Sequence, residues 1–339
     1  MTASNNERCA VQIEPGRSIT LVPKKNAEHL NEQQHDDYAD HRRRFIQWLR
    51  VEGKNPEKRE GYSDYTAYES GYRCARYDRW VWAREDGYTI PPHPEHATQY
   101  IEENVAYRDV TNSTKGKTEE AIARYHDWIT RAYRVDRWDH DQLFSSSGGS
   151  APRDYLTRRE RQAVREAALN TGNWRETSII LVGLDAALRP VEVRRARRQW
   201  VDTDNKMLRL PREESSKNKQ DWRTSLTSRS AHALTEWLKE RSDTAAYDDT
   251  DALWLTRTGT RYSSRSLTRL LRRLCDDAGI ETGGRTMTWY SVRHSTGTYL
   301  TAERDLKAAK DQLRHKSAKT TMKYDQVPAE QRRDALEKM

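Results

Sequence analysis

Apolar and aromatic positions recur every three or four residues along most of the chain, which is the spacing of amphipathic α-helices. In the first part of the chain this spacing predicts four helices, and they fall within residues 29–53, 62–86, 94–107 and 117–135. The second run carries a predicted buried face, made by Tyr65, Tyr68, Tyr72, Arg76 and Trp80. Residues 1–27, which include Pro15 and Pro23, lack this period, so we expect them to form an irregular arm.

A stretch rich in serine and glycine, closed by Pro152, interrupts the helical pattern, and such a composition is typical of a flexible linker. The sequence therefore predicts an irregular arm, a helical domain, a linker and a second domain at residues 1–27, 28–140, 141–153 and 154–339. The second domain opens with Thr157 and Glu160, which are spaced as in a helix capping box.

Within the second domain the helical period gives way to two runs that alternate apolar and polar residues, 199–211 and 222–228. Such alternation, with turn residues between the runs, predicts a small antiparallel sheet. Helical runs then resume and end in a short amphipathic tail. The expected fold is an all-α N-terminal domain followed by a mainly α domain with a small antiparallel β-sheet.

The composition argues against membrane, disulfide-rich and zinc-binding proteins. The chain has no apolar run near the roughly 20 residues that a membrane span needs, and its N-terminus lacks a signal peptide's apolar segment. Its cysteines, Cys9, Cys74 and Cys275, are widely separated. His93 and His96 have HxxH spacing without a further ligand nearby, so no metal or other cofactor is assigned. We expect a soluble, cytoplasmic protein that contacts no membrane.

The net charge of +8 is unevenly distributed along the chain. Residues 1–152 carry a net charge of −3, whereas residues 153–339 carry +11, with 28 arginines against 10 lysines. The planar guanidinium of arginine suits two-point hydrogen bonding to phosphate oxygens. The charge therefore indicates a polyanionic partner, most simply nucleic acid.

Four fragments of the second domain carry the candidate chemistry, and they read AALRPVEV (186–193), ESSKNKQDWR (214–223), WYSVRHSTG (289–297) and LRHKSAKTTMKY (313–324). In content and order they resemble the tyrosine recombinase (phage integrase) family. Its catalytic domain presents an arginine in an LRxxE turn, a hairpin lysine, an HxxR pair, a second His or Trp, and a tyrosine nucleophile. The resemblance covers roughly residues 155–330, and the preceding helical domain is similar to the family's core-binding domain.

The resemblance assigns Arg189 as the first catalytic arginine and Glu192 as a carboxylate that orients its turn. An arginine at a helix start can donate two hydrogen bonds to a phosphodiester and stabilise developing charge. The family's hairpin lysine, a general acid for the leaving 5′ oxygen, matches Lys217 or Lys219. We prefer Lys217, because the Ser-Lys pair directly after the first strand is where the family's lysine usually falls relative to the arginine of the second strand, here Arg223.

The third fragment matches the second arginine with Arg293, followed by His294, but Tyr290 stands where the family has histidine. A phenol, with a pKa of about 10, is a poor base at neutral pH. Either Tyr290 only positions other groups, or His315 and water take over the proton transfer.

The last fragment matches the family's phosphate-pocket histidine with His315 and its nucleophile with Tyr324; Thr321 is the intervening threonine, and Arg314 replaces a glycine. The predicted catalytic set is therefore Arg189, Lys217, Tyr290, Arg293, His315 and Tyr324. Further DNA contacts are predicted at Arg42, Arg43, Arg44, Lys219, Arg223 and His294.

The resemblance implies site-specific DNA cleavage and rejoining through a 3′-phosphotyrosyl intermediate, without metal or ATP. It further implies a homo-tetramer that pairs two double-stranded attachment sites through a Holliday junction, with a possible accessory directionality factor. The N-terminal arm favours integration or excision of a mobile element, such as a virus or plasmid. The alternatives are a catalytically inactive DNA-binding protein of the same fold, which Tyr290 favours, and a type IB topoisomerase-like enzyme.

Overall fold

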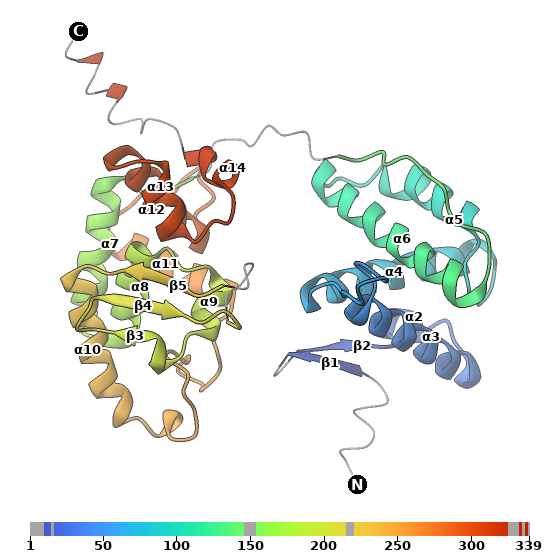
Figure 1. The fold of residues 1–339 in the computed structure, drawn as a ribbon, viewed down its shortest axis with the longest axis horizontal. Helices are drawn as coiled ribbons and strands as arrows, with labels where there is room; N and C mark the ends of the chain where they lie inside the picture. The colour runs from blue at the N-terminus through green and yellow to red at the C-terminus, as the bar shows by residue number, and fades with distance from the viewer. Residues whose placement is uncertain are drawn as a thin grey trace. The chain divides into compact units, whose positions relative to one another are not determined.

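The computed structural model describes residues 10–14, 17–145, 154–214, 220–324, 332–333 and 336–337. The chain separates into two compact units, Met1–Gly148 and Gly149–Met339, and each has its own hydrophobic core (Figure 1). No helix in the described ranges is long and apolar enough to cross a bilayer.

The first unit is built mainly from helices, as its sequence pattern predicts. They are α2 (Lys24–Ala27), α3 (Glu32–Val51), α4 (Asp64–Arg84), α5 (Pro94–Gln99) with a π-helical continuation (Tyr100–Val105), and α6 (Asn112–Tyr133). Asn31 precedes α3 and forms a capping box with Gln34. The Asn31 side chain accepts a hydrogen bond from the Gln34 backbone N–H, and the Gln34 side chain accepts one from the Asn31 backbone N–H.

The chain before residue 28 differs from the irregular arm that we expected. The described residues 10–14 and 17–20 form two antiparallel strands, β1 (Ala10–Glu14) and β2 (Arg17–Thr20), in which Val11 pairs with Ile19. Ile19 and Leu21 are fully buried in the core of the first unit. Their burial stabilises the hairpin against the helices, an effect that a short sequence run with two prolines does not reveal.

The buried face of α4 differs in part from the expectation. Tyr65 is 61 % exposed, and the face turned inward carries Ala67, Cys74, Tyr77 and Val81. Of the predicted face, Tyr68, Tyr72 and Trp80 are partly buried against the core, whereas Tyr65 and Arg76 are exposed. Small side chains on the inner face allow α4 to pack closely against α6.

The second unit consists of helices around a small sheet. The helices are α7 (Arg158–Asn170), α8 (Trp174–Ala186), α9 (Pro190–Arg195), α10 (Ser228–Ser242), α11 (Ser264–Asp277), α12 (Trp289–Glu303), α13 (Leu306–Leu313) and α14 (Ala318–Thr321). Strands β3 (Val201–Asp202), β4 (Met207–Leu210) and β5 (Trp222–Ser225) form an antiparallel sheet in that order. The mainly α fold with a small antiparallel sheet, and the capping box of Thr157 and Glu160, are confirmed.

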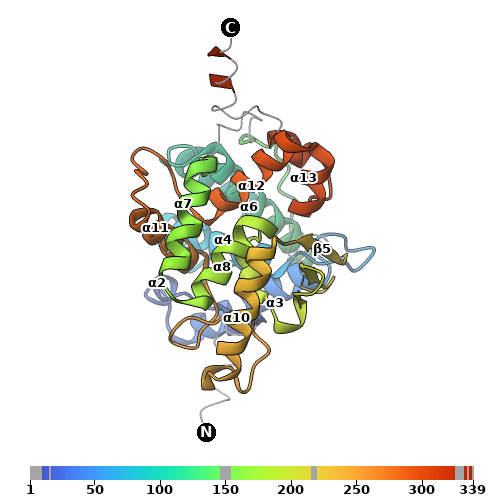
Figure 2. The ribbon, with the colours of Figure 1, turned by 90° about the vertical axis from the view of Figure 1, so that its left-hand side faces the viewer.

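Helix α8 is the centre of the second unit. Every residue from Thr177 to Ala186 is buried, which is expected of a helix that is covered on all sides. Helices α7, α10 and α12 pack against α8, and Figure 2 shows α7, α8 and α10 on the side that faces the viewer. The Gln312 side chain at the end of α13 bonds to Ser225 on β5 and to the Asp185 carbonyl on α8. These bonds fix the end of α13 beside the end of α8.

Gly183 on α8 makes room for the ring of Trp289 on α12. A Cβ at Gly183 would lie 2.7 Å from two atoms of this fully buried ring. The indole Nε1 of Trp289 in turn donates to the Leu188 carbonyl (2.8 Å), just before Arg189. The close approach of α8 and α12 therefore supports the turn that carries Arg189.

Gly183→Ala should lower the free energy of unfolding by about 1–3 kcal/mol, because the rigid indole cannot yield to a new methyl group without moving α12. Chemical unfolding checks this. Gly283→Ala is the matched control, since a Cβ there would meet nothing within 4 Å and its φ is not in the left-handed region. Equal stability of the two variants would contradict the packing argument.

Candidate active site

Residues from three segments of the second unit line a cavity of about 680 Å³. The turn before α9 supplies Arg189, helix α12 supplies Tyr290, Arg293 and His294, and the chain from the end of α13 to Tyr324 supplies the rest. Helices α12, α13 and α14 lie together at one end of the unit (Figure 1). The cavity lining is Arg189, Tyr290, Arg293, His294, Arg314, His315, Lys316, Ser317, Thr320, Lys323 and Tyr324.

Arg189 is held at the start of α9 by the carboxylate of Glu192. Pro190 occupies the first helical position, where its fixed φ favours a helix start. Glu192 accepts from the Arg189 backbone N–H (2.8 Å) through Oε2 and from Arg189 Nη1 (2.9 Å) through Oε1. This two-point contact orients the guanidinium at the cavity wall, as the LRxxE pattern predicted.

Arg314 is a second partner of Glu192 and a fully buried arginine. Its Nη2 donates to Glu192 Oε2 (2.6 Å), and its guanidinium also donates to the carbonyls of Ala186, Ala187 and Gln312. Burial alone would raise the pKa of Glu192, but the guanidinium groups of Arg314 and Arg189 outweigh it and hold that pKa well below its usual value. Glu192 is thus an anion between two cations.

The backbone of Arg314 explains why a glycine is expected at this position. Arg314 ends α13 with φ 55° and ψ 52°, in the left-handed region that favours glycine. An arginine there costs about 1 kcal/mol relative to glycine. The buried ion pair with Glu192 offsets this cost. The sequence showed the departure from the family pattern but not the contacts that accommodate it.

Arg293 lies on α12 and is 3 % exposed. Nη1 donates to the Ala187 carbonyl (2.5 Å), and Nη2 donates to the Leu313 carbonyl and to His315 Nε2 (3.0 Å). Burial, followed by the charges of Arg189 and Arg314, lowers the pKa of Arg293 to about 9. Arg293 therefore remains a cation at neutral pH, and it joins the turn after α8 to the end of α13.

The hydrogen bonds of His315 define its tautomer. A guanidinium can only donate, so His315 Nε2 must accept from Arg293 and the ring proton must lie on Nδ1. Nδ1 then donates to Thr321 Oγ1 (2.9 Å). Burial and the nearby Arg293 and Arg189 lower the pKa of His315 to about 3. His315 is consequently a neutral imidazole in the pocket at neutral pH.

Tyr324 reaches the cavity at the end of a short helical turn, Met322–Tyr324, and is 4 % exposed. Its Oη lies 2.9 Å from His294 Nδ1, and its ring is stacked on that of His315, with centroids 6.1 Å apart. Gly297 makes space for this ring, because a Cβ there would lie 3.0 Å from Tyr324 Cδ1 and Cδ2. Sequence reasoning assigned no role to Gly297, which lies four residues after Arg293 on α12.

Tyr290 lines the same cavity but is 43 % exposed. Its ring is stacked on that of His294 with centroids 6.2 Å apart. Tyr290 and His294 are four residues apart and therefore share one face of α12. Sequence reasoning placed His294 among the DNA contacts, whereas its ring nitrogen points to Tyr324.

The remaining predicted residues are placed as follows. Lys217 and Lys219 lie outside the described residues, and Arg223 is exposed on β5. Arg42 does not fit the expected DNA contact, because it is 1 % exposed and its guanidinium donates to the Gly71 carbonyl (2.6 Å) inside the first unit. Arg43 is partly exposed, and Arg44 is exposed over Trp128 and Tyr133.

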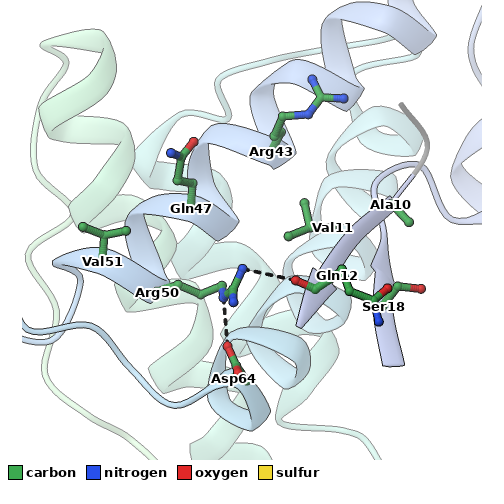
Figure 3. A pocket seen from close by; sticks show the side chains of 9 residues that line it. All are labelled: Ala10, Val11, Gln12, Ser18, Arg43, Gln47, Arg50, Val51 and Asp64. Carbon is green, nitrogen blue, oxygen red and sulfur yellow. Dashed lines mark hydrogen bonds and ion pairs between the residues drawn. The ribbon is translucent and has the colours of Figure 1, made fainter. Parts of the chain in front are cut away.

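Arg43 also lines a separate cavity of about 850 Å³ in the first unit, between the β1–β2 hairpin and α3 (Figure 3). Arg50 is tied there to Asp64 (2.8 Å) and to the Gln12 carbonyl (3.3 Å). This cavity contains none of the predicted catalytic residues. Among the described residues, no cluster of three or more His, Cys, Asp or Glu could hold a metal ion.

The family model described as the phage integrase family matches residues 154–331, which is more than half of the chain. The chain belongs to this family of tyrosine recombinases. The type 1 fimbriae regulatory protein FimE of Escherichia coli K12 is 31 % identical over 176 residues, which cover 51 % of this chain and 85 % of FimE.

Solved tyrosine recombinases share the fold at low sequence identity. The XerH site-specific recombinase bound to its difH substrate superposes with a TM-score of 0.62, at 14 % identity over 92 % of this chain and 90 % of XerH. The Tn1549 transposon integrase in complex with a circular intermediate DNA gives a TM-score of 0.56, at 14 % identity over 87 % of this chain and 99 % of that one. The predicted family and fold class are thereby confirmed.

Arg314→Gly should destabilise this recombinase by roughly 2–4 kcal/mol. Loss of one partner from a buried ion pair costs about 3–5 kcal/mol, and the relief of left-handed strain returns only about 1 kcal/mol. Urea unfolding measures the change. Arg134→Gly is the matched control, because Arg134 also ends a helix at φ 55° but is exposed. If Arg314→Gly were as stable as the control variant, the ion pair would not be the stabilising contact.

The free energy of unfolding should decrease as the pH is lowered, and His315 should account for part of this decrease. The folded state keeps His315 neutral down to about pH 3, whereas the unfolded chain binds a proton near its usual pKa of 6.5. The unfolded state therefore binds more protons in this window, and stability decreases as the pH falls through it.

His315→Asn removes this titration. The difference in unfolding free energy between wild type and variant should change by at most roughly 1.4 kcal/mol per pH unit. Solvent screening in the open cavity makes the expected change smaller than this limit. Urea unfolding from pH 7 down to pH 4 tests this. Parallel pH dependences would show that the His315 pKa is not lowered in the fold.

Proposed function

We propose that this protein is a site-specific recombinase that cleaves and rejoins double-stranded DNA through a covalent bond between Tyr324 and a 3′ phosphate. The observation that carries the proposal is the convergence of Arg189, Arg293, His315 and Tyr324 on one cavity. These residues come from segments that together span 135 positions, from 189 to 324, and their types match what phosphoryl transfer requires: cations, an imidazole and an oxygen nucleophile.

The cations supply the charge stabilisation in this mechanism. A phosphodiester in the cavity would lie beside the guanidinium groups of Arg189 and Arg293, which are already oriented by Glu192 and by backbone carbonyls. Donors fixed in this way stabilise charge on the non-bridging oxygens without reorganising during the reaction. Attack by Tyr324 Oη displaces the 5′ oxygen, and a lysine ammonium group, Lys217 or Lys219, serves as its proton donor.

The covalent intermediate conserves the phosphodiester energy, so rejoining needs no ATP. Attack by a 5′ hydroxyl on the phosphotyrosine reverses the first step and releases Tyr324. We assign the substrate as paired attachment sites of a mobile element, bound by a homo-tetramer with strand exchange through a Holliday junction; a directionality factor is a possible partner. The XerH recombinase and the Tn1549 integrase, which share this fold, were solved in complex with DNA, and this supports DNA as the substrate class.

The nucleophile can be tested with a nicked suicide duplex that carries an attachment site from the borders of the encoding element. Wild type should give a covalent protein–DNA adduct on a denaturing gel in the presence of a chelator, and Tyr324→Phe should give none. Tyr299→Phe is the matched control, because Tyr299 also lies on α12 but does not line the cavity. The guanidinium of Arg158 lies over its ring. The control variant should form the adduct.

The outcome also separates the alternative functions. No adduct on a duplex that the protein demonstrably binds would favour a catalytically inactive DNA-binding protein, for which Tyr290 in place of histidine is the supporting observation. Relaxation of any supercoiled plasmid, without an attachment site, would favour a topoisomerase-like activity. Adduct formation that depends on the attachment site supports the recombinase.

A further inference from the structure

The hydroxyl of Tyr324 has an imidazole partner that the sequence pattern did not assign. His294 Nδ1 lies 2.9 Å from Tyr324 Oη, and the ring centroids are 5.7 Å apart. Both side chains are buried at the cavity wall, with exposures of 7 % and 4 %. The nucleophile is therefore already hydrogen-bonded to a nitrogen that can accept its proton.

Tyr290, the residue at the family's histidine position, does not offer such an acceptor. Within the described part of the chain it makes no hydrogen bond to Tyr324, and it is 43 % exposed. A neutral phenol has no basic site comparable to an imidazole nitrogen. His294 lies one helical turn further along the same face of α12, so the imidazole that Tyr290 lacks is present nearby.

His315 is a poor candidate for the same task. Its Nε2 accepts from Arg293, and its Nδ1 carries the ring proton towards Thr321. Its ring is stacked on that of Tyr324 with an interplanar angle of 6°. This stacking holds the phenol in place, but neither nitrogen of His315 contacts the Tyr324 hydroxyl. His315 thus positions Tyr324, and His294 contacts the reacting atom.

We propose that His294 is the general base of this recombinase, and this assignment rests on the proposed function. As Tyr324 Oη bonds to phosphorus, the Oη–H bond breaks and the proton moves to the lone pair of His294 Nδ1. The P–O5′ bond breaks, and the 5′ oxygen takes a proton from a lysine ammonium group. In the rejoining step the 5′ oxygen bonds to phosphorus and returns its proton to the neutral lysine amine. The P–Oη bond breaks, and His294 returns its proton to Tyr324 Oη.

The neutral tautomer that this step requires carries its proton on Nε2. Several charged and titratable groups line the same cavity and influence the proton equilibrium: Arg189, Tyr290, Arg293, Arg314, His315, Lys316, Lys323 and Tyr324. The cations among them stabilise negative charge on the attacking phenol oxygen. Lys323 in particular has its Nζ 5.0 Å from the centre of the Tyr324 ring.

The test is the single-turnover rate of adduct formation on the suicide duplex, measured from pH 5.5 to 9 with His294→Asn, His294→Ala and Tyr290→Phe. Asparagine can place an amide nitrogen near the position of Nδ1 but cannot accept a proton. We expect His294→Asn to lose about 10²–10⁴-fold in rate and the acid limb of the wild-type profile. Tyr290→Phe should lose much less.

Rescue by free imidazole separates proton transfer from a structural role. Added imidazole should speed His294→Ala in proportion to its neutral fraction, and DNA affinity should stay close to that of wild type. His232→Asn is the matched control, since His232 is an exposed histidine on α10. It should react at the wild-type rate.

The outcomes distinguish the two proposals. If wild type forms the adduct and His294→Asn keeps its rate and pH profile, or if imidazole fails to rescue His294→Ala, His294 is not the base. A larger loss with Tyr290→Phe than with His294→Asn would also overturn the assignment. If wild type forms no adduct at all, the proposed function itself fails, and the assignment of His294 fails with it.

Discussion

The carboxylate of Glu192 accepts hydrogen bonds from the guanidinium groups of both Arg189 and Arg314, and it is 1 % exposed. Arg293 adds a third buried cation nearby, which raises the electrostatic cost of burying all three groups. Glu192 offsets part of that cost and fixes the direction of Arg189. Arg314 and Arg293 also donate to the carbonyls of Ala186 and Ala187 at the end of α8, so this network links the positive charges to the central helix.

The two histidines of the site differ through their neighbours. His315 receives a hydrogen bond from a cation, which consumes its acceptor nitrogen and leaves it neutral. His294 faces the hydroxyl of Tyr324 instead. One imidazole therefore belongs to the framework of the cavity, and the other contacts the proposed nucleophile. Residue type alone does not separate these roles, because the separation depends on which atom each ring nitrogen meets.

Much of the fold was predictable because it depends on local patterns. Helical periodicity located α3 and α6, and the capping residues Thr157 and Glu160 marked the start of α7. The hairpin of β1 and β2 was missed because it is stabilised by the burial of Ile19 and Leu21 against the helices, which no local pattern reveals. Arg42 looked like part of an exposed basic run, yet it is buried, and its Nη1 and Nη2 donate to the backbone carbonyls of Gly71 and Thr20.

The sequence by itself determined the family, the mainly α fold class and the set of candidate residues, because motif spacing and amphipathic period are local properties of the chain. Only the tertiary structure decided which of those residues meet. The contact of His294 with Tyr324 and the pairing of Arg314 with Glu192 join positions 30 and 122 residues apart. Such contacts follow from the packing of α8, α12 and α13 around one core, and no local pattern encodes them.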